Sequence, residues 1–252
     1  MAGTLTVGQL ATGHDVTPII WMNASLLAAT AGATALLPNA TTRSRAHPAP
    51  PPGLAGARGL LKRRGFRVIV IVSALVYGSH AMHDAFAVIW WSHAGIDTSL
   101  ISVLWSEAVA AEVLVFVIGP ALIRRFGVRA AATLAAAAGI IRWTVAATTT
   151  SVLLLSLVQP LHGLTFALLH LACMRMMADN VPANSAATAQ ALYAFGSGCV
   201  TAALTLLSGA LYARYGGVSF LPMAMLCATA LPFAWFGFPA RSPKSELPAF
   251  RH

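Results

Sequence analysis

The sequence predicts an all-α, polytopic membrane helical bundle with about seven transmembrane helices. Of the 252 residues, 58% are hydrophobic and only 9% are charged, whereas soluble domains carry about 25% charged residues. Apolar runs near the roughly 20 residues that a helix needs to cross a bilayer recur along most of the chain. We therefore expect a multi-pass protein whose surroundings are the lipid bilayer.

The net charge of +9 follows from membrane topology, so we expect no nucleic acid partner. Lysine and arginine in short loops mark the cytoplasmic side of membrane proteins. Nearly all basic loops of this chain fall on one side when the long basic segment at 39–65 is placed in the cytoplasm. This orientation predicts a cytoplasmic C-terminus.

The chain divides into four segments. Residues 1–38 are expected to form a short extracytoplasmic N-terminus and one transmembrane helix. Residues 39–65 are rich in Pro, Gly and Arg, which is typical of a flexible linker. Residues 66–238 contain six further apolar runs, and residues 239–252 form a cytoplasmic tail. The six runs lie at about 66–91, 100–123, 128–147, 152–178, 186–212 and 217–238.

Two ionisable residues inside neighbouring runs, Glu112 and Arg142, indicate a site at membrane depth. A charged side chain there costs roughly 2.5–3.5 kcal/mol on insertion scales, so it usually has a partner or faces a water-filled path. A rise of about 1.5 Å per residue places Glu112 about 15 Å and Arg142 about 20 Å from the basic turn that joins their runs. The two side chains could pair, either as a structural ion pair or as part of a substrate or proton site.

The run at 66–91 contains a candidate proton relay. His80 and Asp84 are four residues apart and so share a helix face. A carboxylate beside an imidazole favours the protonated histidine. The alternative is that these side chains belong to interior packing below an interfacial aromatic belt.

The run at 152–178 carries a polar stripe, because four of its residues are spaced by three, four and four positions. The stripe is either the lining of a pathway or a polar packing seam between helices, and its histidines suit proton coupling. Pro160 and Gly163 could also loosen the helix at this depth. In the next run, Gln190 and Tyr193 are further polar candidates. The stripe consists of Gln159, His162, Phe166 and His170.

No cofactor, metal site or catalytic centre is predicted, and we do not expect an enzyme. The three cysteines lie in different runs without C-x-x-C spacing, so neither a disulfide framework nor a zinc site is indicated. His80 and His83 are closely spaced but do not form a repeated ligand cluster. A phosphate-binding G-x-x-x-x-G-K-[ST] loop is not found in the sequence.

Short motifs recur in a fixed order across five of the six runs. They are Tyr77-Gly-Ser-His80-Ala, Leu104-Trp105-Ser106, Ala111-Glu112-Val113, Arg124-Arg125-Phe126-Gly127, Ile141-Arg142-Trp143, Gln159-Pro-Leu-His162-Gly163, Thr165-Phe166, His170-Leu-Ala, Met174-Arg175 and Gln190-Ala-Leu-Tyr193. In this order they resemble the second half of a major facilitator superfamily transporter, most closely the phenylpropionic acid permease type. The first run would correspond to the last span of the preceding half.

The resemblance implies a proton-coupled symporter of twelve spans, located in the bacterial cytoplasmic membrane, with its substrate bound between two six-helix halves. The sequence lacks the first five of these spans, so it is expected to be an N-terminally truncated member. Its partners would be protons, a small organic solute such as an organic or aromatic acid, and a missing N-terminal half or another chain. Nucleosides and sugars remain open as substrates, because they need the same kind of cavity.

In the favoured mechanism, Glu112 and one or both of His162 and His170 carry the coupling proton. Arg142 then neutralises Glu112 or binds a substrate carboxylate. Two aromatic residues would line the substrate space, Tyr77 and Phe166. The alternative is a non-transporting membrane fragment, or a half-transporter that acts only through assembly with another chain.

Overall fold

Helices account for nearly all of the chain that the computed structural model describes, which is residues 17–36 and 54–240. No strand occurs within these two ranges. The elements in order are α2 Thr17–Leu36, α3 Leu54–Lys62, α4 Arg64–Gly78, α5 Ala81–His93, α6 Thr98–Thr148, α7 Val152–Val158, α8 Leu161–Gly163, the π-helix η1 Leu164–Leu168, α9 Leu169–Asn180, the 3-10 helix η2 Ala183–Ser185, α10 Ala186–Tyr215, the 3-10 helix η3 Gly216–Phe220 and α11 Leu221–Gly237.

These elements build about six membrane crossings. Four continuous helical runs are long and apolar enough to span a bilayer, at 64–93, 98–148, 152–180 and 183–237. At 51 residues, a straight α6 would extend about 76 Å, more than twice the roughly 30 Å of a bilayer core. Gly127 divides it, because its φ of 84° and ψ of 165° turn the chain back. The longest run is divided in the same way between α10 and α11 by η3.

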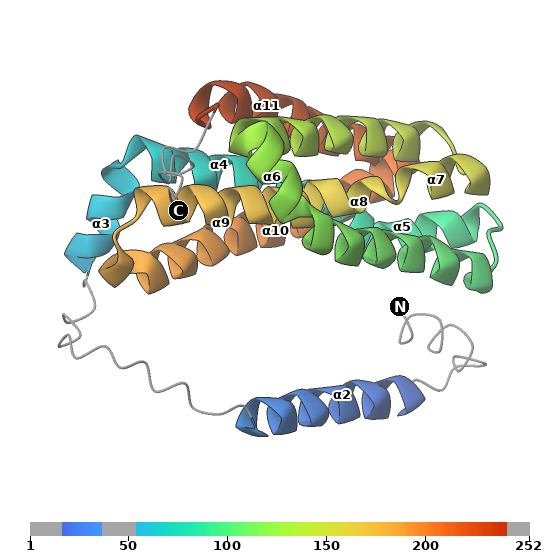
Figure 1. Ribbon diagram of the computed structural model, residues 1–252. Coiled ribbons are helices and arrows are strands. Elements are labelled where there is room, and N and C mark those ends of the chain that lie inside the picture. The colour runs from blue at the N-terminus through green and yellow to red at the C-terminus, as the bar shows by residue number, and fades with distance from the viewer. Residues whose placement is uncertain (1–16, 37–53, 241–252) are drawn as a thin grey trace.

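The predicted all-α membrane bundle is confirmed, but the count is about six crossings instead of about seven. The six predicted runs agree with the six crossings to within a few residues at most ends. The first predicted span corresponds to α2, a separate helix whose described side chains are all exposed (Figure 1). It therefore adds no crossing to the packed bundle.

The segment predicted as a flexible linker is partly helical. Residues 54–65 form α3 and the first residues of α4, and Leu60 of α3 is buried against the bundle. Residues 54–62 contain no proline, so the proline-rich composition that suggested a linker belongs to the preceding stretch. Residues 37–53 and nearly all of the predicted tail, 241–252, lie outside the described residues.

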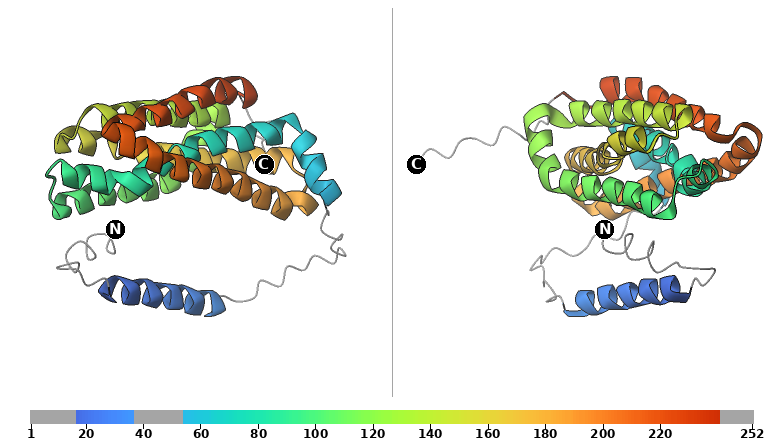
Figure 2. Two further views of the ribbon diagram at one scale, coloured as in Figure 1. Left: turned by 180° about the vertical axis from the view of Figure 1, so that it is seen from behind. Right: turned by 90° about the vertical axis from the view of Figure 1, so that its right-hand side faces the viewer.

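The crossings pack through small residues that bring backbones close together. The second half of α6 lies beside α11 along one side of the bundle, and α10 packs on α4 and α5 at another (Figures 1 and 2). On α6, Gly139 leaves room for Cys227 of α11. On α8, a side chain at Gly163 would meet the Ala111 carbonyl oxygen of α6 at 2.6 Å. Close approach at small residues is the usual way in which membrane helices associate.

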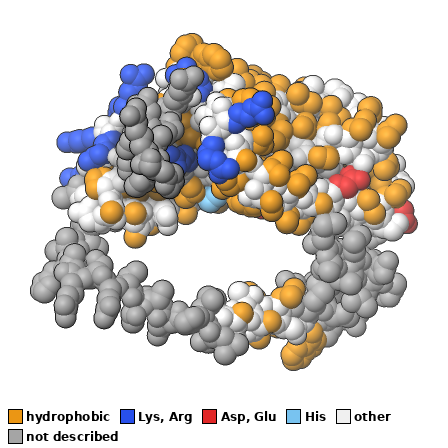
Figure 3. Space-filling model, viewed as in Figure 1, with side chains coloured by type: hydrophobic (Ala, Val, Ile, Leu, Met, Phe, Trp, Pro, Cys, Tyr) orange, Lys and Arg blue, Asp and Glu red, His pale blue; other side chains and the backbone are white. Residues whose placement is uncertain are grey.

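Basic side chains gather at one end of the bundle. On the face shown in Figure 3, Lys and Arg lie toward the end where α3 is found, and Asp and Glu show toward the other end. Two arginines tie helix ends together there. Arg63 donates to the Asn180 carbonyl oxygen at 3.2 Å, and Arg129 donates to the Phe238 carbonyl oxygen at 2.9 Å. The bundle therefore has one basic end, formed by the start of α4 and the ends of α9 and α11.

At the opposite end, α6 begins with a side-chain cap. The Asp97 carboxylate accepts a hydrogen bond from the Ser99 backbone N–H at 2.7 Å, which satisfies a free donor of the first turn. Hydrogen bonding to Ser99 lowers the pKa of this exposed carboxyl below its usual range.

Replacing Gly163 with alanine is expected to push α8 away from α6 and to lower the free energy of unfolding by about 1–3 kcal/mol, because the contact is with rigid backbone. The midpoint of thermal unfolding in detergent measures the effect. Gly198→Ala on α10 is the matched control, since a side chain there meets nothing within 4 Å. Equal melting of the two variants would contradict the close packing described.

Candidate functional site

The site is organised around Arg142, which lies inside the bundle with only 1% of its surface exposed. Its guanidinium is surrounded by hydrogen-bond acceptors from two other crossings. Nη1 donates to His162 Nδ1 at 3.1 Å, and Nη2 donates to Gln159 Oε1 at 3.0 Å and approaches His83 Nε2 at 3.5 Å. The guanidinium also lies over the Trp143 ring at 4.5 Å. These acceptors offset the cost of burying the charge.

Glu112 reaches this centre through His162 and not by direct contact. Its Oε2 lies 3.4 Å from His162 Nε2, and the described residues include no ion pair between Glu112 and Arg142. The direct contact that the sequence allowed is not formed in this structure, because the imidazole of His162 lies between the two groups. Gly163 makes the arrangement possible, since it lets α8 approach the α6 backbone beside Glu112.

Asp84 also has a different partner from the predicted one. Its Oδ1 lies 3.3 Å from Nδ1 of the neighbouring His83, and its side chain is 54% exposed. His80 is buried instead against Trp143 and His162, with ring centroids 5.2 and 5.1 Å away. The expected pairing of His80 with Asp84 is thus not formed, because the His80 ring packs among aromatic rings of the centre and Asp84 contacts His83 instead.

Three buried polar atoms around Arg142 have no hydrogen-bond partner among the described residues. They are His80 Nε2, Gln159 Nε2 and Arg142 Nε. Buried polar groups normally find a partner in protein or in ordered water. The centre therefore has spare hydrogen-bonding capacity for water or a polar ligand.

A second polar group lies beside the first and joins three crossings. The Tyr193 hydroxyl donates to the Tyr77 hydroxyl at 3.0 Å and lies 3.4 Å from His170 Nδ1. Tyr77 in turn approaches the Phe166 carbonyl oxygen at 3.5 Å. The Phe166 ring stacks on His162, with centroids 5.7 Å apart and an interplanar angle of 9°. Phe166 thus connects the two groups and remains 38% exposed.

Breaks in two crossings set the positions of these side chains. The first crossing is interrupted between α4 and α5 at Ser79 and His80, and the crossing at 152–180 is interrupted by Pro160 and the π-helix η1. Proline removes a backbone donor and disturbs the helix before it, and π turns are frequent at functional sites. The predicted loosening of the helix at Pro160 and Gly163 is confirmed. It places Gln159 and His162 on the side of Arg142.

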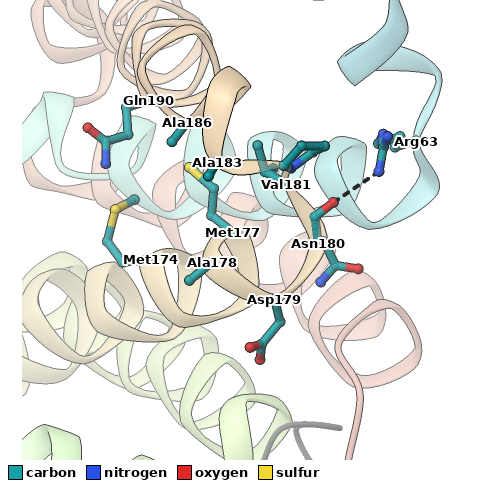
Figure 4. Close-up of a pocket in the computed structure, with 11 residues that line it drawn as sticks. Arg63, Met174, Met177, Ala178, Asp179, Asn180, Val181, Ala183, Ala186 and Gln190 are labelled. Carbon is teal, nitrogen blue, oxygen red and sulfur yellow. Dashed lines mark hydrogen bonds between the residues drawn. The ribbon is translucent and has the colours of Figure 1, made fainter. Parts of the chain in front are cut away.

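Gln190 does not join this centre. It lies at the wall of a separate cavity of about 800 Å³ at the basic end, between the end of α9 and the start of α10 (Figure 4). Most of the lining is apolar, with Met174 and Met177 among its residues, and the hydrogen bond from Arg63 to Asn180 closes one side. Of the predicted site residues, Gln190 alone is among its lining residues.

Sequence reasoning noticed His83 and Tyr193 as polar residues of their runs but did not assign them to the site. His83 is buried with only 2% of its surface exposed, and it faces both Asp84 and Arg142. Its place next to an acid and three residues after His80 was a usable signal, since residues three apart lie on neighbouring positions of a helix. Tyr193 has no comparable local signal, because its partners come from other crossings.

An apolar helical bundle with a buried, hydrogen-bonded cation at its centre is characteristic of multi-pass membrane proteins with a polar path. The chain belongs to the major facilitator superfamily, since the sequence model of the MFS_1 like family matches residues 12–222.

A curated relative supports the same assignment. The chain is 35% identical over 172 residues to the "Probable 3-phenylpropionic acid transporter" of Escherichia coli (strain K12), an alignment that covers 68% of this chain and 45% of the relative. The chain thus spans about half the length of the curated relative it matches.

Replacing Arg142 with alanine is expected to lower the free energy of unfolding by about 3 kcal/mol, because buried acceptors on His162, Gln159 and His83 lose their donor. Unfolding in detergent at neutral pH measures the change. Arg175→Ala is the control, since Arg175 is half-exposed and pairs with Asp179 on its own helix, so its loss should cost less than about 1 kcal/mol. A similar decrease in the free energy of unfolding for both variants would show that the buried contacts of Arg142 contribute little to stability.

Proposed function

We propose that this chain provides one six-helix unit of a proton-coupled transporter for a small organic acid. The observation that carries the proposal is the continuous contact from Glu112 through His162 to Arg142 inside the bundle. Intramembrane acids, bases and histidines are the usual components of proton relays and substrate sites. Membership of the major facilitator superfamily supports transport as the general activity.

Within this chain of contacts, Glu112 is the proposed proton carrier. Its side chain is 25% exposed, so it can exchange a proton with water while remaining in contact with the buried centre. His162 would transmit the change, because its ring lies between Glu112 and Arg142 and contacts both. When Glu112 becomes neutral, the positive charge of Arg142 is no longer balanced by the Glu112 carboxylate. Arg142 then becomes available to an anionic substrate.

The surroundings fit an aromatic or other organic acid. The exposed ring of Phe166 stacks on His162, and the partly exposed Tyr77 ring lies 5.4 Å from that of Phe166. An aromatic wall beside a guanidinium suits a ligand with an apolar body and a carboxylate. The name of the Escherichia coli relative, a probable 3-phenylpropionic acid transporter, suggests 3-phenylpropionate as the first solute to test.

Cells that express the full chain are expected to accumulate radiolabelled 3-phenylpropionate at acidic pH and to lose this uptake when a protonophore collapses the proton gradient. Glu112→Gln should abolish gradient-driven accumulation, since the amide cannot carry a proton. Arg142→Lys should lower it by about tenfold or more, because a lysine lacks the planar fork that contacts several acceptors.

Glu107→Gln is the matched control for the uptake experiment. Glu107 lies five residues before Glu112 on α6 and accepts a hydrogen bond from Ser156 at 2.7 Å, a bond that glutamine can still accept. This variant should keep its uptake. Full uptake by both the Glu112 and the Arg142 variants would contradict the proposed mechanism.

The second candidate function is a half-transporter that acts only with a partner. Alternating access needs one half to rock against another, and the bundle exposes large apolar side chains on α10, with Phe195 70% and Leu206 82% exposed. A second six-helix unit, from another chain or from a second copy, would cover such a surface. Absence of uptake by the wild-type chain alone, with uptake restored by co-expression of a partner half, would favour this function.

The proposed location is the bacterial cytoplasmic membrane, with the basic end of the bundle in the cytoplasm. This follows from the positive-inside rule and from the common position of Arg63 and Arg129 at that end.

A green fluorescent protein fused after His252 is therefore expected to fluoresce, and alkaline phosphatase fused there should be inactive. A fusion in the loop after Ile96, between α5 and α6, is the internal control and should give the reverse pattern. Active phosphatase at the C-terminus would show the opposite orientation.

A further inference from the structure

Arg142 is flanked by two arms of the same kind, each consisting of an imidazole followed by a carboxylate. The first arm is His162 and Glu112, which the proposed function already uses. The second arm is His83 and Asp84, with 3.5 Å from Arg142 Nη2 to His83 Nε2 and 3.3 Å from His83 Nδ1 to Asp84 Oδ1. It comes from α5, whereas the first comes from α8 and α6. The proposed function leaves this second arm without a role.

Hydrogen-bond chemistry makes the two arms equivalent. A guanidinium has donors only, so the ring nitrogen that faces Arg142 must accept in both histidines. Each neutral ring then carries its proton on the other nitrogen, which is Nδ1 in His83 and Nε2 in His162. Both of these nitrogens face a carboxylate oxygen. Asp84 and Glu112 therefore both interact with the charge of Arg142 through an oriented imidazole.

The charges of this group add to one cation and two carboxylates. When Glu112 takes a proton, one carboxylate remains for the guanidinium. We propose that Asp84, acting through His83, is the second counter-ion of Arg142 and keeps that buried charge compensated while Glu112 carries the proton. This inference rests on the proposed function. It makes Asp84 and His83 positioning residues for the proton-binding step.

The difference in exposure between the two acids fits these roles. The Asp84 side chain is 54% exposed and that of Glu112 is 25% exposed. Water stabilises an ionised carboxylate, and burial disfavours it. This difference in exposure fits Asp84 as the counter-ion and Glu112 as the proton carrier.

No other described group can take the place of Asp84 as a counter-ion. The remaining titratable side chains at the centre are His80 and Cys227, which belong to the α5 region and to α11. An imidazole and a thiol carry no negative charge at neutral pH. Gln159 of the crossing at 152–180 accepts from Arg142 but is neutral. After Glu112 is protonated, the negative charge at this centre thus comes from Asp84.

The test is the protonation of Glu112 in the purified full chain, reconstituted in lipid and followed by infrared spectroscopy. The carboxylic acid C=O band of Glu112 is assigned as the difference between the wild type and Glu112→Gln and is then titrated with pH. Without Asp84, Glu112 is the last acid that compensates Arg142, so its ionised form is favoured. Asp84→Asn should move the midpoint to lower pH by about one unit.

A second variant tests the connection through the ring. His83→Ala removes the bridge and should shift the midpoint in the same direction and by a similar amount, and combining it with Asp84→Asn should add little. This variant also keeps the test decisive if the Asp84 variant folds poorly, which thermal unfolding reveals. Glu107→Gln removes an acid from α6 that has no link to Arg142 and should leave the midpoint unchanged.

The outcomes separate the two proposals. A titrating Glu112 band that Asp84→Asn does not move, or that Glu107→Gln moves equally, overturns the role of Asp84 and leaves the proposed function standing. If no Glu112 band appears at any pH, Glu112 takes no proton, and the proposed proton coupling fails together with the inference. If the titration midpoint of the Glu112 band moves to lower pH only in the Asp84 and His83 variants, the result supports Asp84 as the second counter-ion of Arg142.

Discussion

The burial of one guanidinium is the constraint on which the arrangement of the bundle centre depends. Arg142 is almost fully enclosed, and an enclosed charge in an apolar bundle is tolerable only when acceptors surround it. Two other crossings supply them, one through His83 and the other through Gln159 and His162. Removing either of these crossings would leave the charge with unsatisfied donors. The polar centre therefore links helices whose remaining contacts are mostly apolar.

Backbone irregularity is what lets regular helices meet this constraint. The break at Ser79 and His80 and the break at Pro160 both lie next to the residues that face Arg142. Gly163 then brings a polar turn against the α6 backbone. In each case a local departure from helix geometry is balanced by contacts in the centre. Irregular backbone at membrane depth is tolerated where protein or a cavity covers it.

The sequence predicted the crossings well and the contacts poorly. Long apolar runs and basic turns locate the spans because bilayer thickness fixes their length. The sequence also placed Glu112 and Arg142 at similar heights in neighbouring runs, and both contact His162 in the structure. Height along a helix, however, does not say which side chain lies between two others. His162 fills that place because α8 packs closely on the α6 backbone at Gly163. In the same way, helical spacing paired His80 with Asp84, but the Asp84 carboxylate contacts the neighbouring His83 and the His80 ring packs on Trp143 and His162.

The π-helix at Leu164–Leu168 has a consequence for how this centre can move. A π turn holds one residue more than an α turn, and one residue corresponds to a rotation of about 100° around a helix axis. If the bulge migrated along the chain past His162, this histidine would rotate off the face that it shares with Arg142 while Tyr193 and His170 kept their contact. No hinge between helices would be needed. The position of the bulge within this crossing would thus determine which of its residues face Arg142.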